Sequence, residues 1–223
     1  MLNNLEQALK TGFIDKQFPS DERLQPRLLL NDKRTGTKVL SSLLEALGTC
    51  DEFWFSVAFV TRSGLACIHN RLIELEAKGV RGKILVSQYL NFTEPEALRL
   101  LHGFQNIETR FIQDHRFHGK GYIFKNSDQY ELIIGSSNLT SSALCENAEL
   151  NIKLTSSDNS GLIHETLNSF AQFFEMAHPL TPDLISSYED TYEAHRLNHP
   201  QLYSEKLLPG LSNNQVIFEP NAM

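Results

Sequence analysis

Cysteine is scarce in this chain of 223 residues. The three thiols, Cys50, Cys67 and Cys145, are widely spaced and odd in number. A disulfide framework or a zinc cluster needs paired or closely spaced cysteines, so the sequence argues against both. We expect free thiols in a reducing cytoplasm.

Long apolar runs are also missing. No stretch approaches the roughly 20 residues of a membrane-spanning helix. The N-terminal MLNNLEQALKTGF carries acidic and amide side chains where a secretory signal has basic and then apolar ones. A hydrophobic content of 41% still suffices for a buried core. We therefore expect a cytoplasmic protein without a membrane partner.

An excess of positive charge is the third absence. The net charge of −7 by itself disfavours nucleic acid as a partner. Residues 1–140, however, hold 17 basic and 16 acidic side chains, whereas residues 141–223 hold 3 and 11. Because the acidity belongs to the C-terminal third, it does not exclude a nucleic-acid partner for the first 140 residues.

Apolar runs alternate with helical patterns in the middle of the chain. Short runs rich in β-branched and aromatic residues predict buried strands over 52–60, 82–87 and 107–112. Thr61 can cap a helix whose apolar face repeats every three or four residues, at Leu65, Ile68, Leu72 and Leu75. This order of strands and helices predicts parallel βαβ units.

Other helices are indicated nearby. Residues 3–10 and 35–48 have helical patterns. The segment TEPEALRLLHGF opens with Thr93 and Glu96 in the spacing of a capping box, with Pro95 in its first turn.

The periodicity changes after residue 116. Alternating side chains predict strands over 117–125 and 129–136, joined as a hairpin, and another over 147–154. A long helix follows, with five apolar residues on one face: Ile163, Leu167, Phe170, Phe174 and Ala177. We predict an α/β domain over 1–180 on a mixed, mostly parallel sheet. The acidic segment 181–223, with weak helical periodicity, is interpreted as an appendage or linker.

The segment FHGKGYIFK carries the first candidate chemistry. On an extended strand, His118 and Lys120 leave the same face, and the glycines beside them permit close approach of a ligand. A neutral imidazole is a nucleophile or base near pH 7, and lysine adds positive charge. Phosphorus needs an attacking nitrogen and its oxygens need donors, so this pair suits a phosphate group.

A polar turn and a carboxylate complete the set. The turn GSSN ends the following strand, where Ser136 and Asn138 can donate to phosphate oxygens. Glu149 can accept from one imidazole nitrogen and leave the other free to attack. The candidate catalytic residues are therefore His118, Lys120, Ser136, Asn138 and Glu149; Lys120, Ser136 and Asn138 would bind the phosphate.

These residues resemble the signature of the phospholipase D superfamily. The matching elements are H-x-K at 118–120, G-S-x-N at 135–138 and N-x-E at 147–149, with Glu149 eleven residues after Asn138. The resemblance implies the phospholipase D-like fold, a mixed sheet with helices on both faces. It also implies a metal-independent phosphodiesterase that forms a phosphohistidine.

One position departs from the family pattern. The family has an acidic residue seven positions after the histidine, where this chain has Lys125, and the nearest acid is Asp128. In the family that acid mostly supports structure, so the catalytic interpretation stands. Its loss disfavours a choline-lipid phospholipase and is common among nuclease-like members.

A narrower resemblance concerns FVTRSGL, SQYLNFTEPEAL, FHGKGYIF and IGSSNLTSSAL. They resemble the phospholipase D-like domain that precedes a superfamily 2 helicase in bacterial proteins related to restriction enzymes. The final FEPNAM resembles the segment leading into the motor. This implies an endonuclease module that has DNA as partner and a helicase domain in the same full-length chain.

The sequence has a single H-x-K motif. Single-copy members of the superfamily dimerise, so the resemblance implies a symmetric homodimer with one composite site. One His118 would attack phosphorus and the other would protonate the leaving oxygen. The two Lys120 side chains would supply the charge that a metal provides elsewhere, so no metal or other cofactor is expected.

Alternatives stay open. The domain could be an inactive DNA-binding or dimerisation module, or a phospholipase or small phosphodiesterase, although membrane signals are missing. Asp114, His115 and His118 could hold a metal, but on a strand residue 115 faces away from the other two. Candidate contacts to a nucleic-acid backbone are Arg62, Arg110, Arg116 and Lys125.

Overall fold

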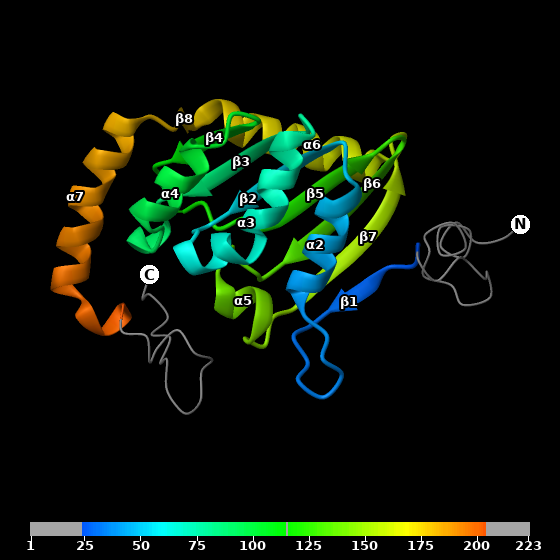
Figure 1. Ribbon diagram of the computed structural model, residues 1–223, viewed down its shortest axis with the longest axis horizontal. Helices are drawn as coiled ribbons and strands as arrows, with labels where there is room; N and C mark the ends of the chain where they lie inside the picture. Colours follow the sequence, from blue (N-terminus) through cyan, green and yellow to red (C-terminus); the bar gives the residue numbers. More distant parts are fainter. Residues whose placement is uncertain (1–23, 115, 204–223) are drawn as a thin grey trace, which may run out of the picture.

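One eight-stranded sheet organises the chain. The computed structural model describes residues 24–114 and 116–203, and the strand order is β1-β7-β6-β5-β2-β3-β4-β8 (Figure 1). The strands are β1 (Arg27–Leu29), β2 (Glu52–Val57), β3 (Arg81–Ser87), β4 (Ile107–Ile112), β5 (Gly121–Asn126), β6 (Gln129–Gly135), β7 (Asn151–Ser157) and β8 (His178–Pro179). The helix expected over 3–10 lies outside the described residues.

Parallel and antiparallel pairs divide the sheet. β2, β3 and β4 pair in parallel, as the βαβ pattern predicted. β5, β6 and β7 form an antiparallel meander attached to β2, including the predicted hairpin. The α/β class and the mixed sheet are confirmed. The expectation of a mostly parallel sheet is wrong: a short turn forces antiparallel pairing of β5 with β6, and the β1–β7, β2–β5, β4–β8 and β6–β7 pairs are antiparallel as well.

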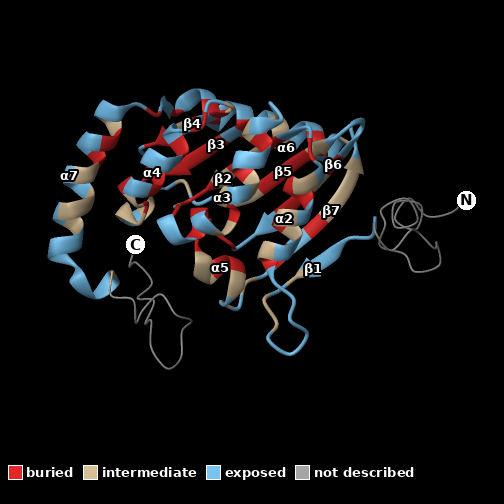
Figure 2. Ribbon diagram, viewed as in Figure 1, coloured by how far each residue is buried: buried red, intermediate tan, exposed pale blue. Residues whose placement is uncertain are grey.

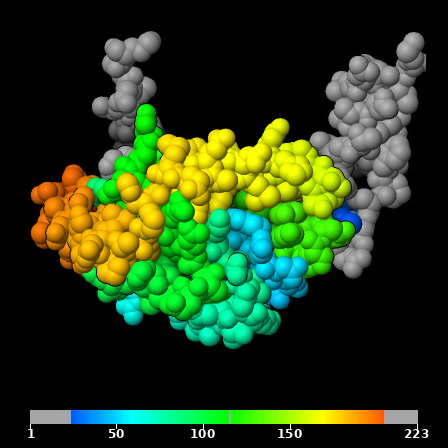
Figure 3. All heavy atoms as spheres, turned by 90° about the horizontal axis from the view of Figure 1, so that it is seen from above, coloured from blue at the N-terminus to red at the C-terminus, as the bar shows by residue number. Residues whose placement is uncertain are grey.

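Helices cover the two faces unequally. One face carries α2 (Val39–Thr49), α3 (Arg62–Ala77), α4 (Pro95–His102) and α5 (Ser141–Cys145), and the other carries α6 (Gly161–Met176) (Figures 1 and 3). The main core lies between the sheet and the first group. Two smaller clusters lie under α6.

The two longest predicted apolar stripes are confirmed. Thr61 caps α3, because its hydroxyl accepts from the backbone N–H of Gly64 at 3.1 Å. The stripe residues Leu65, Ile68, Leu72 and Leu75 are buried. On α6, Ile163, Phe170 and Phe174 are buried against the sheet.

The start of α4 differs from expectation. Glu94 is the N-cap residue, and no side chain caps this end. The hydroxyl of Thr93 instead donates to the carbonyl oxygen of Ser87 at 2.7 Å. Thr93 is completely buried, and its hydroxyl satisfies the carbonyl oxygen at the end of β3 and leaves the N-terminus of α4 uncapped. The predicted capping box is therefore wrong, although Pro95 does begin the helix.

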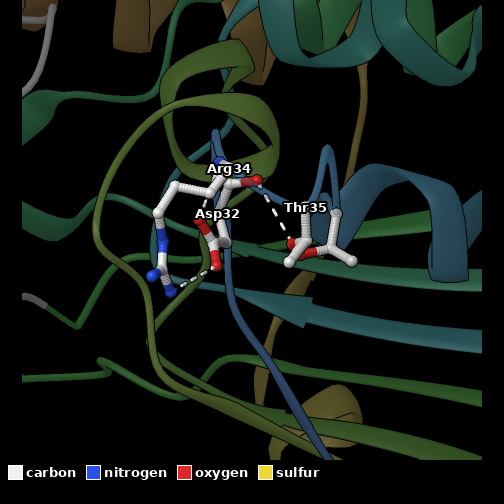
Figure 4. Close-up of polar contacts among 4 residues, drawn as sticks. Asp32, Arg34 and Thr35 are labelled. Carbon is white, nitrogen blue, oxygen red and sulfur yellow. Dashed lines mark hydrogen bonds and ion pairs between the residues drawn. The ribbon is translucent and has the colours of Figure 1, made fainter.

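The loop between β1 and α2 is held by its own polar contacts. The carboxylate of Asp32 accepts from the backbone N–H of Arg34 at 2.8 Å and from its guanidinium at 3.3 Å (Figure 4). The carbonyl of Asp32 accepts from the hydroxyl of Thr35 at 3.5 Å. The hydrogen bonds from Arg34 lower the pKa of Asp32. This loop leads into Val39, where α2 begins.

On the sheet face that carries α6, none of the described helices covers the end formed by β1 and β7. Leu28, Ile152 and Ile134 follow one another in register across β1, β7 and β6 and are 57%, 47% and 40% exposed. Leu150, just before β7, is 63% exposed. Figure 2 shows the contrast between the exposed β1 and the buried centre of the sheet. We call Leu28, Ile134, Leu150 and Ile152 the apolar row.

The residues after 180 continue the fold. α7 (Pro182–Asn198) packs against α4, and its Ile185 and Tyr188 are each 2% exposed within the main core. A short turn, η2 (Pro200–Leu202), follows. The boundary at residue 180 stays a prediction, and FEPNAM lies outside the described residues. No helix among those described has the length and apolarity to cross a bilayer.

Candidate phosphate-binding site

His118 and Lys120 lie in the loop that enters β5. The strand predicted over 117–125 begins only at Gly121, so these two residues precede it. Gly119 and Gly121 offer no side chains to pack against neighbouring strands, which favours a late start of the ladder. The carbonyl of Lys120 accepts from the backbone N–H of Gly135 at 3.4 Å, which places the loop beside the end of β6.

Lys120 is a half-buried cation. Its Nζ donates to the carbonyl oxygen of His118 at 2.9 Å, and within the described residues it forms no ion pair. Desolvation lowers the pKa of Lys120 to about 8, and the carboxylate of Glu149 opposes this shift. The ammonium is therefore held near a carboxylate without being neutralised by it, which leaves it able to bind an anion.

The His118 imidazole lies against an aromatic ring. Its centroid is 4.3 Å from that of Tyr89, with an interplanar angle of 40°. Tyr89 belongs to the turn η1 (Tyr89–Asn91), which follows β3. Desolvation and the charge of Lys120 lower the pKa of His118. Both effects favour the neutral imidazole, which is the form that attacks phosphorus.

Ser136 and Glu149 form a hydrogen-bonded pair. The Ser136 hydroxyl donates to Glu149 Oε2 and accepts from the backbone N–H of Leu150 at 2.9 Å. The strand expected over 147–154 begins at Asn151, so Glu149 stands on the loop before β7. The Glu149 carboxylate therefore accepts a hydrogen bond from Ser136 and interacts electrostatically with Lys120. Among the described residues, no hydrogen bond joins Glu149 to His118 of the same chain.

Asn31 steadies the segment that leads to Glu149. Its Nδ2 donates to the carbonyl oxygens of Ala143 and Asn147, both at 2.9 Å. Its Oδ1 accepts from the backbone N–H of Val39. One amide side chain thereby links the start of α2 to α5 and to the first residues of the segment that follows it.

Asn138 has a structural role as well as its predicted one. The side chain is 7% exposed, and Oδ1 accepts from the backbone N–H groups of Ala58 at 3.1 Å and Phe59 at 3.3 Å. These contacts join the polar turn to the end of β2. The Nδ2 group has no hydrogen-bond partner in the described part of the chain, so it can donate to a ligand oxygen.

Two supporting residues went unrecognised in the sequence. Asn151 Oδ1 accepts from the backbone N–H of Ser137 at 3.2 Å, and its Nδ2 donates to the Ser137 hydroxyl at 2.9 Å. Both residues are buried. Gly135 is required here, because a Cβ would stand 2.2 Å from the carbonyl oxygen of Leu150. The available signal was the position of Asn151, two residues after Glu149 at the first position of β7.

Lys125 lies away from these groups. It occupies the opposite end of β5, in register with Glu52 on one side and Tyr130 on the other. Its Nζ lies 6.0 Å from the centroid of the Tyr130 ring. The departure from the family pattern at this position therefore does not alter the groups around Lys120.

A groove of about 440 Å³ begins at Lys120 and runs along α6. Its apolar lining includes Phe117, Phe170, Phe173, Ile134 and Leu162, and its polar rim includes Glu165 and Thr166. The volume falls in the range of ordinary ligand pockets. This lining suits an apolar or aromatic group next to Lys120.

The possible metal cluster of Asp114, His115 and His118 lies only partly within the described residues. His115 lies outside the described residues, and Asp114 accepts from the backbone and guanidinium of Arg116. Residues 24–114 and 116–203 contain no group of three His, Cys, Asp or Glu side chains arranged to hold a metal.

A model of a known family matches residues 43–175. The family is described as "Cardiolipin synthase, PLD-like domain", and the match contains all five predicted catalytic residues. A comparison with curated proteins finds no relative.

Solved structures share the fold. NucT from Helicobacter pylori is 16% identical with a TM-score of 0.54, over 70% of this chain and 98% of that one. Nuc from Salmonella typhimurium, described as a phospholipase D family member, is 18% identical with a TM-score of 0.53 over the same shares. Phosphatidylserine synthase from Haemophilus influenzae is 13% identical with a TM-score of 0.57, over 82% of this chain and 47% of that one.

Identities this low establish the fold and leave the substrate open. The family model is stronger evidence, because it covers more than half of the chain, from within α2 to near the end of α6, and includes strands β2 to β7. The chain therefore belongs to the family of PLD-like domains.

Proposed function

We propose that this chain hydrolyses phosphodiester bonds of DNA without a metal, through a phosphohistidine at His118. The observation that carries the proposal is the state of Lys120. A half-buried ammonium that forms no ion pair within residues 24–114 and 116–203 lies next to a partly desolvated imidazole. A bound phosphate would supply the missing negative charge and bring phosphorus to the imidazole.

The chemistry needs two imidazoles. The neutral His118 attacks phosphorus, a P–N bond forms, and the P–O bond to the leaving strand breaks. A protonated His118 of the partner subunit gives its proton to the leaving oxygen. That imidazole, now neutral, takes a proton from water, the water oxygen attacks phosphorus, and the P–N bond breaks. Lys120 and the Asn138 amide stabilise the charge on the non-bridging oxygens.

A homodimer would supply the second imidazole. The apolar row lies directly beside Ser136 and Glu149 and exposes four large aliphatic side chains: Leu28, Ile134, Leu150 and Ile152. Contiguous exposed apolar surface of this kind is typical of protein interfaces. A second copy seated on this row would bury it and bring two sites together around one symmetry axis.

The contacts of Glu149 suggest which histidine it orients. Its Oε2 is bonded to Ser136 of the same chain, and His118 of the same chain packs on Tyr89. We propose that each Glu149 accepts from His118 of the partner subunit. Each carboxylate would then fix the imidazole tautomer across the two-fold axis.

DNA is favoured over other phosphodiesters by the surroundings. Arg62, at the start of α3, and Arg116, two residues before His118, are 69% and 92% exposed. Arg62 pairs with Glu96 and Arg116 with Asp114, and surface pairs of this kind are weak enough to exchange for the phosphates of a long polyanion. The resemblance to helicase-linked domains supports the same substrate, and association with a helicase domain in a longer chain is part of this proposal.

The groove favours a second candidate, a lipid phosphodiester. Its apolar lining reaches Lys120, so an acyl chain would fit beside the phosphate as well as a nucleobase would. A protein that binds DNA without cleaving it is the third outcome that the experiment must recognise.

The test is cleavage of plasmid DNA in EDTA, alongside hydrolysis of a phosphatidyl ester in mixed micelles and gel filtration. We expect metal-free DNA cleavage by a dimer, lost in His118→Ala but retained in His164→Ala, a matched histidine on exposed α6 surface. Full activity of His118→Ala, or loss of activity in EDTA, overturns the mechanism. Hydrolysis of the lipid alone assigns the second candidate, and DNA binding without cleavage assigns the third.

A further inference from the structure

The turn that carries Tyr89 has a strained backbone. Leu90 and Asn91 are consecutive non-glycine residues with φ of +50° and +56°. Left-handed conformations at such residues persist only where surrounding contacts enforce them, and they cluster at functional sites. The turn follows β3 directly, at the end of the strands where the His118 loop also lies.

Ser87 ties this turn to the His118 segment. The buried Ser87 hydroxyl accepts from the backbone N–H of Tyr89 at 3.0 Å. The same hydroxyl donates to the carbonyl oxygen of Phe117 at 3.2 Å, one residue before His118. A single side chain therefore sets the distance between the backbone that carries the phenol and the backbone that carries the imidazole.

The C-terminal segment holds the turn from its other side. The Tyr203 hydroxyl donates to the carbonyl oxygen of Asn91 at 2.9 Å. Since this donation uses its only proton, the hydroxyl accepts from Nδ1–H of His195 on α7, at 2.6 Å. The Phe92 ring packs between Phe59 and Tyr203, with centroid distances of 5.6 and 5.9 Å.

A tyrosine of α7 itself contacts the residue after Phe92. The Tyr188 hydroxyl donates to the carbonyl oxygen of Thr93 at 2.8 Å, and Tyr188 is 2% exposed. The turn is thus fixed at both ends, by Ser87 from the sheet and by α7 and η2 from the surface. These contacts enforce the left-handed pair that directs the Tyr89 ring.

We propose that Tyr89 is a positioning residue for His118, and that α7 and η2 hold it there through Tyr203. The ring covers one face of the imidazole, which limits its rotation and keeps water from that face. This inference rests on the proposed role of His118, but its contacts can be measured without any substrate.

The primary experiment is a pH titration of the His118 ring by NMR on the free protein. In the wild type we expect a ring-current shift of the His118 Cε1 proton and a titration midpoint below the ordinary 6.5. Tyr89→Ala should abolish the ring-current shift and raise the midpoint towards 6.5, because it hydrates the imidazole. Tyr89→Phe should preserve both features, because it retains the ring.

The second experiment separates positioning from stability. We expect Tyr89→Ala to lower kcat by up to ~100-fold with little change in KM, since displacing a nucleophile by about 1 Å costs that much. Tyr203→Phe should change the His118 signal in the same direction by a smaller amount. Tyr192→Phe is the matched control on α7, because its hydroxyl has no hydrogen-bond partner among the described residues.

Each outcome decides between the two proposals. An unchanged His118 signal in Tyr89→Ala, or a Tyr89→Phe protein that behaves like Tyr89→Ala, overturns the positioning role. A Tyr203→Phe protein indistinguishable from Tyr192→Phe overturns the part played by α7 and η2. If the NMR shifts appear as expected and the wild type cleaves no phosphodiester, the proposed function fails while the positioning contact stands.

Discussion

Two lysines on this sheet are held in opposite ways. Lys153, on β7, is 3% exposed, and its Nζ lies 2.8 Å from Glu131 and 3.7 Å from Glu45. Lys120, at the entrance to β5, is half-buried and hydrogen-bonds only to a carbonyl oxygen in the described part of the chain. Its pKa is lowered to about 8.

Under the proposed function, the difference separates a structural charge from one that binds phosphate. A buried cation with a carboxylate in contact is already neutralised and has little to offer a ligand. A desolvated cation without such a partner stays electrostatically unsatisfied until an anion arrives. Burial alone therefore does not identify a site; the absence of a counter-ion beside a nucleophile does.

Replacing Lys120 should have the largest effect. We expect Lys120→Met to lower kcat by about 100- to 1,000-fold, the usual loss when one donor to transition-state charge is removed. The melting temperature should not fall, because the charged form is disfavoured in the folded state. Calorimetry beside a plasmid assay checks both statements. A stable protein with unchanged kcat would remove Lys120 from the site.

Removing the partner of Lys153 should act on stability instead. We expect Glu131→Gln to lower the free energy of unfolding by about 3 kcal/mol, the lower end for breaking a buried ion pair, because Glu45 remains. Urea denaturation measures this change. Glu45→Gln is the control: Glu45 is 69% exposed, so its loss should cost less than ~1 kcal/mol. Equal losses in the two variants contradict the comparison.

The pH dependence of kcat/KM should report the two groups of the site. Activity should rise as the attacking imidazole loses its proton, with a midpoint below the ordinary 6.5 because the pKa of His118 is lowered. It should fall towards high pH, because the partner subunit's His118 must keep its proton to act as general acid and because Lys120, whose pKa is about 8, loses its charge. The upper limb should move to higher pH in Lys120→Arg, since guanidinium stays protonated. An upper limb unmoved by that change assigns it to another group.

The smallest effect is expected at Lys125. Lys125→Asp restores the acid of the family pattern, but the position lies at the far end of β5. We expect kcat to stay within roughly twofold, as for a surface substitution away from special contacts. Steady-state kinetics beside Lys120→Met tests this. A large gain in activity would show that the lysine suppresses catalysis from a distance.

The order of elements was predictable from the sequence because local patterns set it. Thr61 caps α3 through a side chain three residues from its partner, and the α6 stripe repeats within one helix. The starts of β5 and β7 were not predictable in this way. They depend on where Gly121 and Asn151 find partners on strands distant in the chain.

The sequence predicted which residues make up the candidate site. It did not predict which of their side chains contact one another. The signature gives His118 and Glu149, but the carboxylate meets Ser136 in the folded chain. Tyr89 escaped notice because its contact with His118 spans two loops and a left-handed turn. Side-chain partners that depend on the relative placement of loops leave no periodic signal in the sequence.

Trapping the covalent intermediate tests the central claim most directly. A labelled DNA strand is mixed with the protein in EDTA, the reaction is quenched in denaturant within its first turnover, and the protein is digested and mapped. The account predicts an acid-labile DNA adduct on the peptide that contains His118, absent in His118→Ala and strongly reduced in Lys120→Met. Cleavage without an adduct at His118, or an adduct on another residue, would contradict it.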